Sequence, residues 1–455
     1  MPAAQMDRPP PLTLQNTLPS PQQDLPHSLH QKAHPEILSD PETTEHDSDL
    51  SSYSLPTTPT SSASTHSHDH DQDHDHDHDR DDDEDHDLDA DEESEILTKI
   101  HAKLAQIQSI YDAGKPLFPR QLLGKLDQQI DAGEQEVQIQ DLDGVNHAYS
   151  LVVPGWCADF ATSYRIAYNS IQNLTCIHPS FPEISLRDTS PVSICYTSSP
   201  EYFPKAAYED VEAAFDRNQK KWAESQTCAT LVQNLKDLMK DGRLGRGKVR
   251  KIVGFGLGSL AAIEEETGGN ASGRGHGGKV GLGDGYHCVR AHAQHAAIMT
   301  IAQTLLTKWN AATSASENDN RVNEEYLIEI YVQDPAYTPI DHTLLEKINI
   351  KPLEDPKGFL EIDSSTLVFS VSPNVPVKQV VADVCWPAAM IWNTVSLEEK
   401  ESQWEKKVRD GEEFWVVPFT TDPDSTRVRD MVTGYTSVAL KDSDEFFGDL
   451  TIYAR

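Results

Sequence analysis

The feature that most constrains the fold is a regular alternation of short apolar runs with longer amphipathic segments in the second half of the chain. The runs have the length of buried strands, and the segments between them have helical periodicity. Strands that alternate with helices form βαβ units, whose strands lie parallel in one sheet. The sequence therefore predicts an α/β fold with a Rossmann-like, mostly parallel sheet flanked by helices. The predicted strands are 251–258, which runs into glycines, 325–332, 367–371 and 388–392, and the predicted helices are 288–309, 338–348 and 377–386.

The rest of this half adds weaker signals. Thr338 is followed by Pro at the first helical position and by Asp341 three residues later, which is typical of a helix start. Ser396 with Glu399 gives the same capping pattern, so a further helix is expected there. Two apolar runs, at 414–419 and 450–453, are expected to add strands at an edge of the sheet.

The segment before this core is expected to form helices and a hairpin. A hairpin is predicted over 137–153 with its turn at Asp143-Gly144. The proline-containing stretch 178–204 is interpreted as a surface connection, and 208–239 as one long amphipathic segment. A short helix is expected over 121–130, and a longer one begins near Ser94 with an apolar stripe formed by Ile96, Ile100, Leu104 and Ile107.

These limits divide the chain into three parts. Residues 1–93 are an acidic arm rich in His and Asp, 94–247 are the helical and hairpin part, and 248–455 are the Rossmann-like core with a C-terminal extension. The arm has too few large apolar residues to offset its backbone entropy, so we expect it to be disordered. Within it, 66–87 is nearly pure His-Asp alternation, which is either a solvated spacer or a weak chelator of transition metals.

Charge and cysteine usage limit the partners. The chain has a formal net charge of −36, and its first 95 residues hold 25 acidic and 3 basic side chains. A surface of this sign repels phosphate backbones, so we expect no nucleic-acid partner and expect other proteins, through basic patches, or free cations instead. The sequence contains no run of 18 apolar residues, which a membrane-spanning helix would require. The six cysteines are scattered without a C-x-x-C pair, as in a protein of the cytoplasm, the nucleus or both.

Three glycines, Gly254, Gly256 and Gly258, end the first core strand. Glycines at this place let backbone amides approach a phosphate or a ribose, and a helix N-terminus favours anions. The G-x-G-x-x-G pattern is met only in its looser form, read from Gly256 to Ala261. A tight strand-to-helix turn explains the same glycines without a ligand.

Two charged residues are candidates for the same site. Asp334 follows the second core strand, where an acidic residue accepts hydrogen bonds from ribose hydroxyls, or alternatively caps the turn before Pro335. Arg290 lies near the start of the next helix, one turn before Gln294, where a guanidinium can hold an anionic ligand or pair with a surface carboxylate. Gly254, Gly256, Gly258, Arg290 and Asp334 are therefore the candidate cofactor-binding residues.

Metal binding and catalysis have little support in the sequence. His287, Cys288, His292 and His295 are close together on one predicted helix, but no further ligand at a recognisable spacing accompanies them, so no metal site is predicted. The chain has no G-x-S-x-G, Walker or H-E-x-x-H motif, and its catalytic residues, if any, are unknown.

The core segments together resemble the SRR-like family, named for sensitivity to red light reduced. The resemblance covers about 248–394 and rests on five segments and on Arg290 with Gln294. The segments are Ile252-Val-Gly-Phe-Gly-Leu-Gly-Ser, Tyr331-Val-Gln-Asp-Pro, Leu345-Glu-Lys-Ile-Asn-Ile, Gly358-Phe-Leu and Phe369-Ser-Val-Ser-Pro. The ending Gly448-Asp-Leu-Thr-Ile-Tyr-Ala-Arg resembles that of filamentous-fungal members. The resemblance implies a Rossmann-like regulatory protein of unassigned biochemical activity and cofactor. It also implies links to light and circadian signalling, haem metabolism and microtubule-related regulation.

The sequence departs from the family pattern in two places. An insert at 261–285 follows the glycines and holds nine glycines between Gly268 and Gly285, so it is interpreted as a mobile loop, either a lid or an inert insertion. The segment after Ser370 lacks the histidine that many members have nearby. Two hypotheses follow: a non-catalytic interaction module, or an enzyme or switch that binds a dinucleotide or S-adenosylmethionine at the strand ends.

Overall fold

A seven-stranded sheet forms the centre of the molecule. The computed structural model describes residues 90–183, 185, 190–198, 207–262, 286–314, 327–398, 403–409 and 412–455, with 90–93, 286–288, 310–314 and 409 described by their backbone alone. The strand order is β12-β13-β9-β8-β5-β6-β7. The strands are β5 (Lys251–Phe255), β6 (Glu329–Gln333), β7 (Lys351–Pro352), β8 (Thr366–Ser370), β9 (Ala389–Asn393), β12 (Thr436–Leu440) and β13 (Leu450–Ala454).

The strand directions confirm the predicted α/β fold. Strands β5 to β9 all run parallel, whereas β13 and β12 are antiparallel additions beside β9. The chain passes outward from β5 through β6 to β7, and then crosses back to place β8 on the other side of β5. The strand order therefore reverses between β5 and β8. In doubly wound sheets ligands bind outside the carboxyl ends of the strands at such a reversal.

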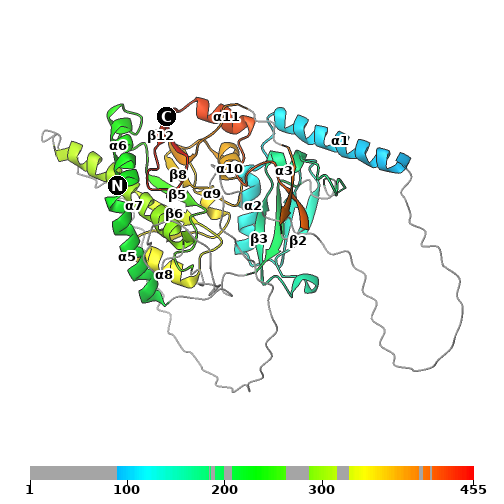
Figure 1. Cartoon of the computed structure of the whole chain (residues 1–455), viewed down its shortest axis with the longest axis horizontal. Helices are drawn as coiled ribbons and strands as arrows, with labels where there is room; N and C mark the ends of the chain where they lie inside the picture. Colours follow the sequence, from blue (N-terminus) through cyan, green and yellow to red (C-terminus); the bar gives the residue numbers. More distant parts are fainter. Residues whose placement is uncertain are drawn as a thin grey trace, which may run out of the picture. The chain divides into compact units, whose positions relative to one another are not determined.

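Helices cover one face of the sheet in a single hydrophobic cluster. They are α5 (Tyr208–Glu224), α6 (Gln226–Lys240), α7 (Tyr286–Ser314) and α8 (Pro339–Lys347). Figure 1 shows α5 and α6 in green outside α7, which lies next to the sheet. Ile252 of β5 points into this cluster, and its neighbour Val253 points to the opposite face. Both faces of the strand are buried, because side chains alternate along an extended chain.

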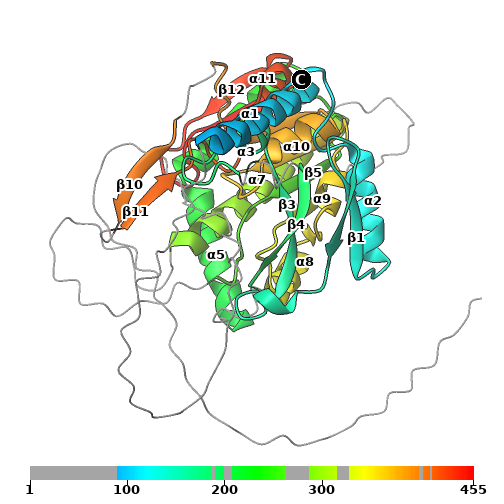
Figure 2. The ribbon, with the colours of Figure 1, turned by 90° about the vertical axis from the view of Figure 1, so that its right-hand side faces the viewer.

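The opposite face is covered by C-terminal and N-terminal elements together. The C-terminal ones are α9 (Lys357–Leu360), α10 (Val377–Val384) and α11 (Thr426–Thr433), and Figure 2 shows α10 and α11 packed together with α1 nearby. The N-terminal elements are α1 (Ala90–Asp112), α2 (Arg120–Asp131), α3 (Ile171–Thr175), the 3₁₀ turn η1 (Gly155–Cys157) and four strands. One hydrophobic cluster contains residues of both groups, from Ile100 to Tyr453.

The four N-terminal strands form two hairpins. Strands β1 (Glu136–Gln140) and β2 (Asn146–Ser150) pair around the Asp143-Gly144 turn, which confirms the predicted hairpin. Strands β3 (Ser163–Tyr168) and β4 (Val192–Thr197) form the second. The predicted helical stripe is also confirmed in α1, because Ile100, Leu104 and Ile107 are buried.

Four local predictions were wrong. Residues 192–197 are a strand within the predicted surface connection, since Val192 and Ile194 are buried against β3. The long segment 208–239 is two helices, because Ser225 is extended and its hydroxyl caps α6. Among the described residues no helix begins at Ser396: 397 and 398 form a bend, the Ser396 hydroxyl donates to the Glu398 carbonyl, and 399–402 lie outside the described residues. Strand β11 (Glu412–Val416) pairs only with β10 (Glu405–Arg409), apart from the main sheet.

The acidic arm and the glycine-rich insert lie outside the described residues, apart from 90–93 and the insert's first two residues. The three-part division of the chain stays a prediction. Among the described helices none has the length and hydropathy that crossing a membrane requires.

Candidate functional site

The three glycines form a turn in which two of them have backbone angles that favour glycine. Gly256 and Gly258 have φ of +65° and +77°, in the left-handed region. A Cβ on Gly256 would lie 2.9 Å from the Cβ of Pro373, which follows β8. A Cβ on Gly254 would lie 2.7 Å from Cδ1 of Ile298 on α7. The glycines thus allow the turn itself and the close approach of α7 and the segment after β8.

Asp334 lies at the end of β6 and binds this turn directly. Its Oδ2 accepts a hydrogen bond of 2.7 Å from the Gly258 amide, and its Oδ1 accepts one of 2.8 Å from the Ala336 amide. Burial raises the pKa of Asp334, while these two amides and the positive charge of Arg165 act in the opposite direction. The structure therefore brings Gly258 and Asp334 together, as the two candidate positions require, and it also gives Asp334 its capping role.

Asp341 binds the next part of the turn and is completely buried. Its Oδ1 accepts hydrogen bonds from the amides of Leu260 and Ala261, at 2.6 and 3.0 Å. Its Oδ2 accepts from the Ser259 hydroxyl at 2.9 Å and from the amide and hydroxyl of Thr338. Asp341 completes the predicted capping box of α8 and holds the β5 turn at the same time.

The protein's own atoms therefore accept the hydrogen bonds of four turn amides. Gly256 donates to the Gln333 carbonyl, Gly258 to Asp334, and Leu260 and Ala261 to Asp341. In phosphate-binding turns of related architecture such amides point at the ligand. Here two carboxylates accept the hydrogen bonds of three of these amides.

Beside this turn lies a buried histidine that is electrically neutral. His295 of α7 donates through Nδ1 to the Ala291 carbonyl at 2.7 Å, so its Nε2 accepts the Tyr337 hydroxyl at 2.8 Å. Burial lowers the pKa of His295 to about 4. Burial, with the charges of Asp334 and Asp341, raises the pKa of Tyr337 well above its usual value.

The histidines of α7 do not form a metal site with the described residues around them. The two ring nitrogens of His292 form hydrogen bonds with the side-chain amide of Asn218, at 2.8 Å, and with the Leu260 carbonyl, at 3.0 Å. His295 is bonded as described above. The side chains of His287 and Cys288 lie outside the described residues. Within the described part, no three His, Cys, Asp or Glu side chains are grouped as metal ligands would be.

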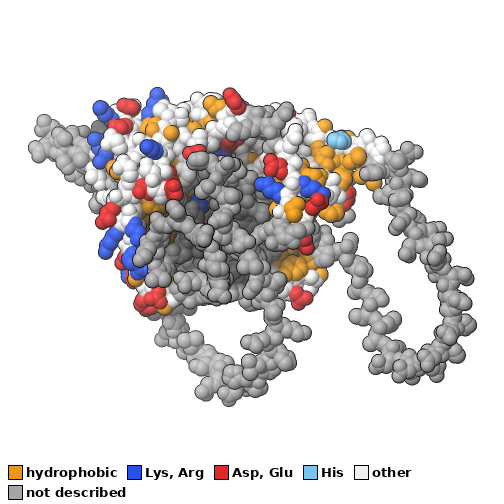
Figure 3. All heavy atoms as spheres, in the orientation of Figure 1, with side chains coloured by type: hydrophobic (Ala, Val, Ile, Leu, Met, Phe, Trp, Pro, Cys, Tyr) orange, Lys and Arg blue, Asp and Glu red, His pale blue; other side chains and the backbone are white. Residues whose placement is uncertain are grey.

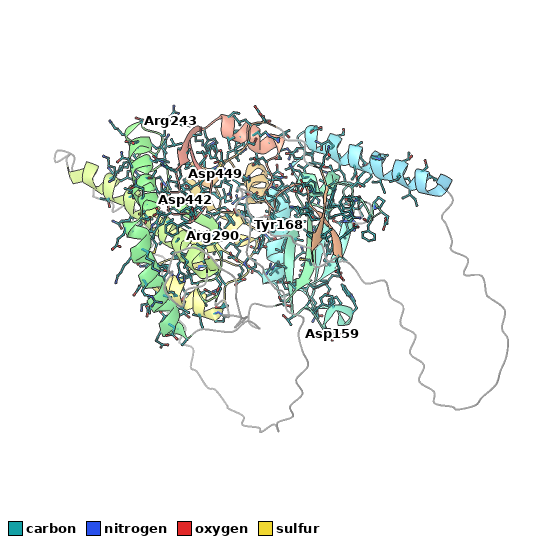
Figure 4. The ribbon with its side chains drawn as sticks, viewed as in Figure 1. Asp159, Tyr168, Arg243, Arg290, Asp442 and Asp449 are labelled. Atoms are coloured by element: carbon teal, nitrogen blue, oxygen red, sulfur yellow. The ribbon has the colours of Figure 1, made fainter. Side chains whose placement is uncertain are left out.

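Arg290 is at the N-terminal end of α7, as predicted, and it bonds a loop between two other strands of the sheet. Its Nε donates to the carbonyl of Phe446 at 3.2 Å, in the loop that joins β12 to β13 (Figure 4). Asp442 of the same loop accepts hydrogen bonds from the amides of Phe447 and Gly448. One turn along α7, the buried Oε1 of Gln294 has no hydrogen-bond partner among the described residues.

A second group of polar residues lies at the ends of β6 and β3, and no residue of it was a candidate in the sequence. Asp355 accepts the Tyr168 hydroxyl at 2.6 Å and the Gln333 side-chain amide at 2.8 Å. Burial raises the pKa of Asp355 to about 7, against those hydrogen bonds and the charge of Arg165. Tyr168 is labelled in Figure 4 near the centre of the molecule. The half-buried Arg165 therefore lies within electrostatic reach of both Asp334 and Asp355.

Sequence patterns gave partial signals for these residues. The alternation in Ser163-Tyr-Arg-Ile-Ala-Tyr is typical of a strand and could have located Arg165 and Tyr168. Asp341 was recognised only as a helix cap. Asp355 precedes a proline and gave no signal, because its partners are 22 and 187 residues away in the sequence.

The fold and the strand-end geometry define the class: an α/β protein with a Rossmann-like parallel sheet, whose order reverses between β5 and β8. Residues 229–453 match the SRR1 domain family, from within α6 to the end of the central sheet in β13. These residues are therefore an SRR1 domain, as the resemblance of the core segments implied. No curated protein matches the chain.

Proposed function

We propose that this SRR1-domain protein is regulatory and acts by binding other proteins, without a reaction of its own. The settings are those that the family resemblance implied: light and circadian signalling, haem metabolism and microtubule-related regulation. Its location is the cytoplasm, the nucleus or both, and neither nucleic acid nor membrane is among its partners. A source in a filamentous fungus also stays a prediction.

The observation that carries this proposal is the bonding of the β5 turn. A nucleotide phosphate at a Rossmann-like turn is held by free backbone amides. The amides of Gly258, Leu260 and Ala261 instead bond Asp334 and Asp341. An incoming phosphate would have to displace these carboxylates and would lie close to their negative charges.

A second candidate function is the binding of a nucleoside-containing ligand, such as a dinucleotide or S-adenosylmethionine, by an enzyme or switch. The unpaired Oε1 of Gln294 favours it, because a buried acceptor without a partner is costly. Asp334 also supports it, since each of its oxygens accepts only one of the hydrogen bonds described and retains capacity for a ribose hydroxyl.

Thermal-shift measurements against nucleotides, dinucleotides and S-adenosylmethionine separate the two functions. If the protein acts only by binding other proteins, the wild type shows no shift with any of these compounds. If a nucleoside site exists, the wild type is stabilised, and Gly256→Val and Asp334→Ala lose that response. Glu346→Ala, an exposed change on α8, is the matched control and keeps the wild-type behaviour. A ligand shift that disappears only in the two site variants would overturn the proposed function.

A further inference from the structure

A groove of about 720 Å³ runs along the outer surface where α5, α6 and α7 meet. It lies on the face of the sheet opposite the N-terminal hairpins, and Figure 1 shows the three helices together. Its lining is mixed: apolar side chains make most of the floor, and longer polar side chains stand at the sides. The floor includes Trp222, Ala223, Val232, Ala296 and Met299.

The charged side chains that line this groove are all basic. Lys220 of α5, Lys236 of α6 and Lys308 of α7 line it, and no Asp or Glu is among the described lining residues. All three lysines are exposed, and none forms an ion pair or side-chain hydrogen bond with another described residue. Each helix thus supplies one ammonium group that is available to a partner.

Two of these lysines, Lys220 and Lys236, belong to a basic segment of an otherwise acidic chain. Residues 217–251 contain ten Lys and Arg against three Asp and Glu, a net charge of +7 in a protein of −36. Figure 3 shows Lys and Arg side chains over α5 and α6, with Asp and Glu side chains among them. Such a local reversal of sign attracts acidic surfaces, while the rest of the molecule repels them.

The floor distinguishes between kinds of acidic partner. Met299 and Val232 are partly exposed, and Met side chains adapt to apolar groups of different shapes. The Trp222 indole donates to the Thr300 hydroxyl at 2.9 Å, so its polar atom is already bonded within the protein. A nucleic-acid backbone would gain nothing from this apolar floor, whereas the apolar stripe of an amphipathic helix would be buried on it.

We propose that this groove binds an acidic amphipathic helix of a partner protein. The inference rests on the proposed protein-binding function and deepens it by assigning the surface and the partner chemistry. The helix places its apolar side chains at i, i+3 and i+4 on the floor, and its carboxylates face Lys220, Lys236 and Lys308. A second copy of this chain is a poor occupant, because two chains of charge −36 repel each other.

A displayed library of random 16-residue peptides, selected against the immobilised full-length protein, tests the proposal. Enriched peptides are expected to be acidic, with apolar residues at helical spacing. Their affinities are then measured for the wild type, for Lys220→Glu/Lys236→Glu, and for Val232→Gln. The charge-matched control is Lys125→Glu/Lys441→Glu, which changes two exposed lysines outside the groove.

The charge-reversal variant should bind the enriched acidic peptides at least about tenfold more weakly, and Val232→Gln should also weaken them. The control should bind them like the wild type. Enriched peptides that bind the groove variants as tightly as the wild type would overturn the groove while leaving a protein-binding function in place. The proposed groove would also be overturned if no peptides were enriched, or if the enriched peptides were basic. Tighter binding of a single-stranded oligonucleotide than of the peptides would overturn it as well. So would self-association of the protein that the charge-reversal variant abolishes. The proposed function itself is tested separately, by the thermal-shift measurements with nucleoside compounds, and a site-specific ligand shift there would overturn it.

Discussion

The carboxylate of Asp334 accepts a hydrogen bond from the backbone amide of Gly258, with 2.7 Å between the two heavy atoms. These residues follow two adjacent parallel strands, β6 and β5, and meet because the carboxyl ends of parallel strands lie at one edge of a sheet. The contact ties the glycine turn to the next strand. It is therefore a place where the stability of the turn can be measured apart from any ligand.

Asp334→Ala should lower the free energy of unfolding by about 1.5–3 kcal/mol, because the Gly258 and Ala336 amides lose a charged acceptor. Asp334→Asn should lose less, since its side-chain oxygen still accepts one of these bonds. Glu346→Ala, on the exposed face of α8, should be nearly neutral. Urea unfolding of the three variants checks the order, and an Asp334→Ala protein as stable as the wild type would contradict the capping role.

Asp341→Ala should be more destabilising, by at least about 3 kcal/mol, because it leaves buried donors on Leu260, Ser259 and Thr338 without an acceptor. Both oxygens of Asp341 accept hydrogen bonds, so Asp341→Asn must point its NH₂ group at donors and should also be destabilised. Chemical unfolding measures both. If Asp341→Ala does not fold, the stability of Asp341→Asn tests the prediction. An Asp341→Asn protein as stable as the wild type would show that the second carboxylate oxygen is not needed as an acceptor.

Gly256→Ala should cost about 2–4 kcal/mol, from a left-handed φ and from contact with Pro373. Gly144→Ala is the matched control, because Gly144 has φ of +86° but open space around its Cβ position. That variant should lose only about 1 kcal/mol. Thermal unfolding of both proteins tests the contact. Equal losses of unfolding free energy would mean that Pro373 can shift without destabilising the protein.

His295 should make the protein less stable in mild acid. It stays neutral in the folded state because burial lowers its pKa to about 4, whereas in the unfolded chain it takes up a proton below about 6.5. Between these values the unfolded state binds more protons, so this contribution falls by about 2 kcal/mol from pH 6.5 to pH 4.5. Asp355 and Asp422, whose pKa values burial raises to about 7, act in the opposite direction over this whole range, because the folded state then binds more protons than the unfolded chain.

The two effects are separated by comparing variants rather than by the wild-type profile alone. His295→Gln should lose stability at neutral pH, but lose less of it on acidification than the wild type. His101→Gln, an exposed change on α1, should keep the wild-type pH profile. Unfolding free energies at four pH values between 4.5 and 7.5 give the comparison, and parallel profiles for wild type and His295→Gln would rule out this role of His295.

Limited proteolysis should remove residues 1–93 and leave a folded fragment that begins near Ser94. The reason is compositional, since the arm lacks the apolar side chains that a core requires. Mass spectrometry identifies the fragment, and circular dichroism with thermal unfolding shows whether it stays folded. Loss of cooperative unfolding after the cut would contradict the division of the chain.

Predictions from the sequence succeeded where a local pattern is enough. The alternation in the core predicted the parallel strands, since each is a continuous apolar run bounded by turn residues. The Thr338 cap was equally visible, because its partner Asp341 is only three residues away. Strand β4 was missed, because it lies between prolines and its burial depends on pairing with β3. The Ser396 pattern predicted a helix start, but in the described residues the Ser396 hydroxyl bonds the Glu398 carbonyl and the chain bends at 397 and 398.

The sequence by itself determined the class of fold, the glycine turn after β5 and the concentration of acidic residues in the arm. These follow from properties of neighbouring residues: side-chain periodicity, the backbone freedom of glycine and composition. Only the tertiary structure decided what the turn amides bond to, that Arg290 contacts Phe446, and that Lys220, Lys236 and Lys308 surround one groove. Those relationships join residues tens to more than a hundred positions apart, and they exist only once the sheet and its helices have packed.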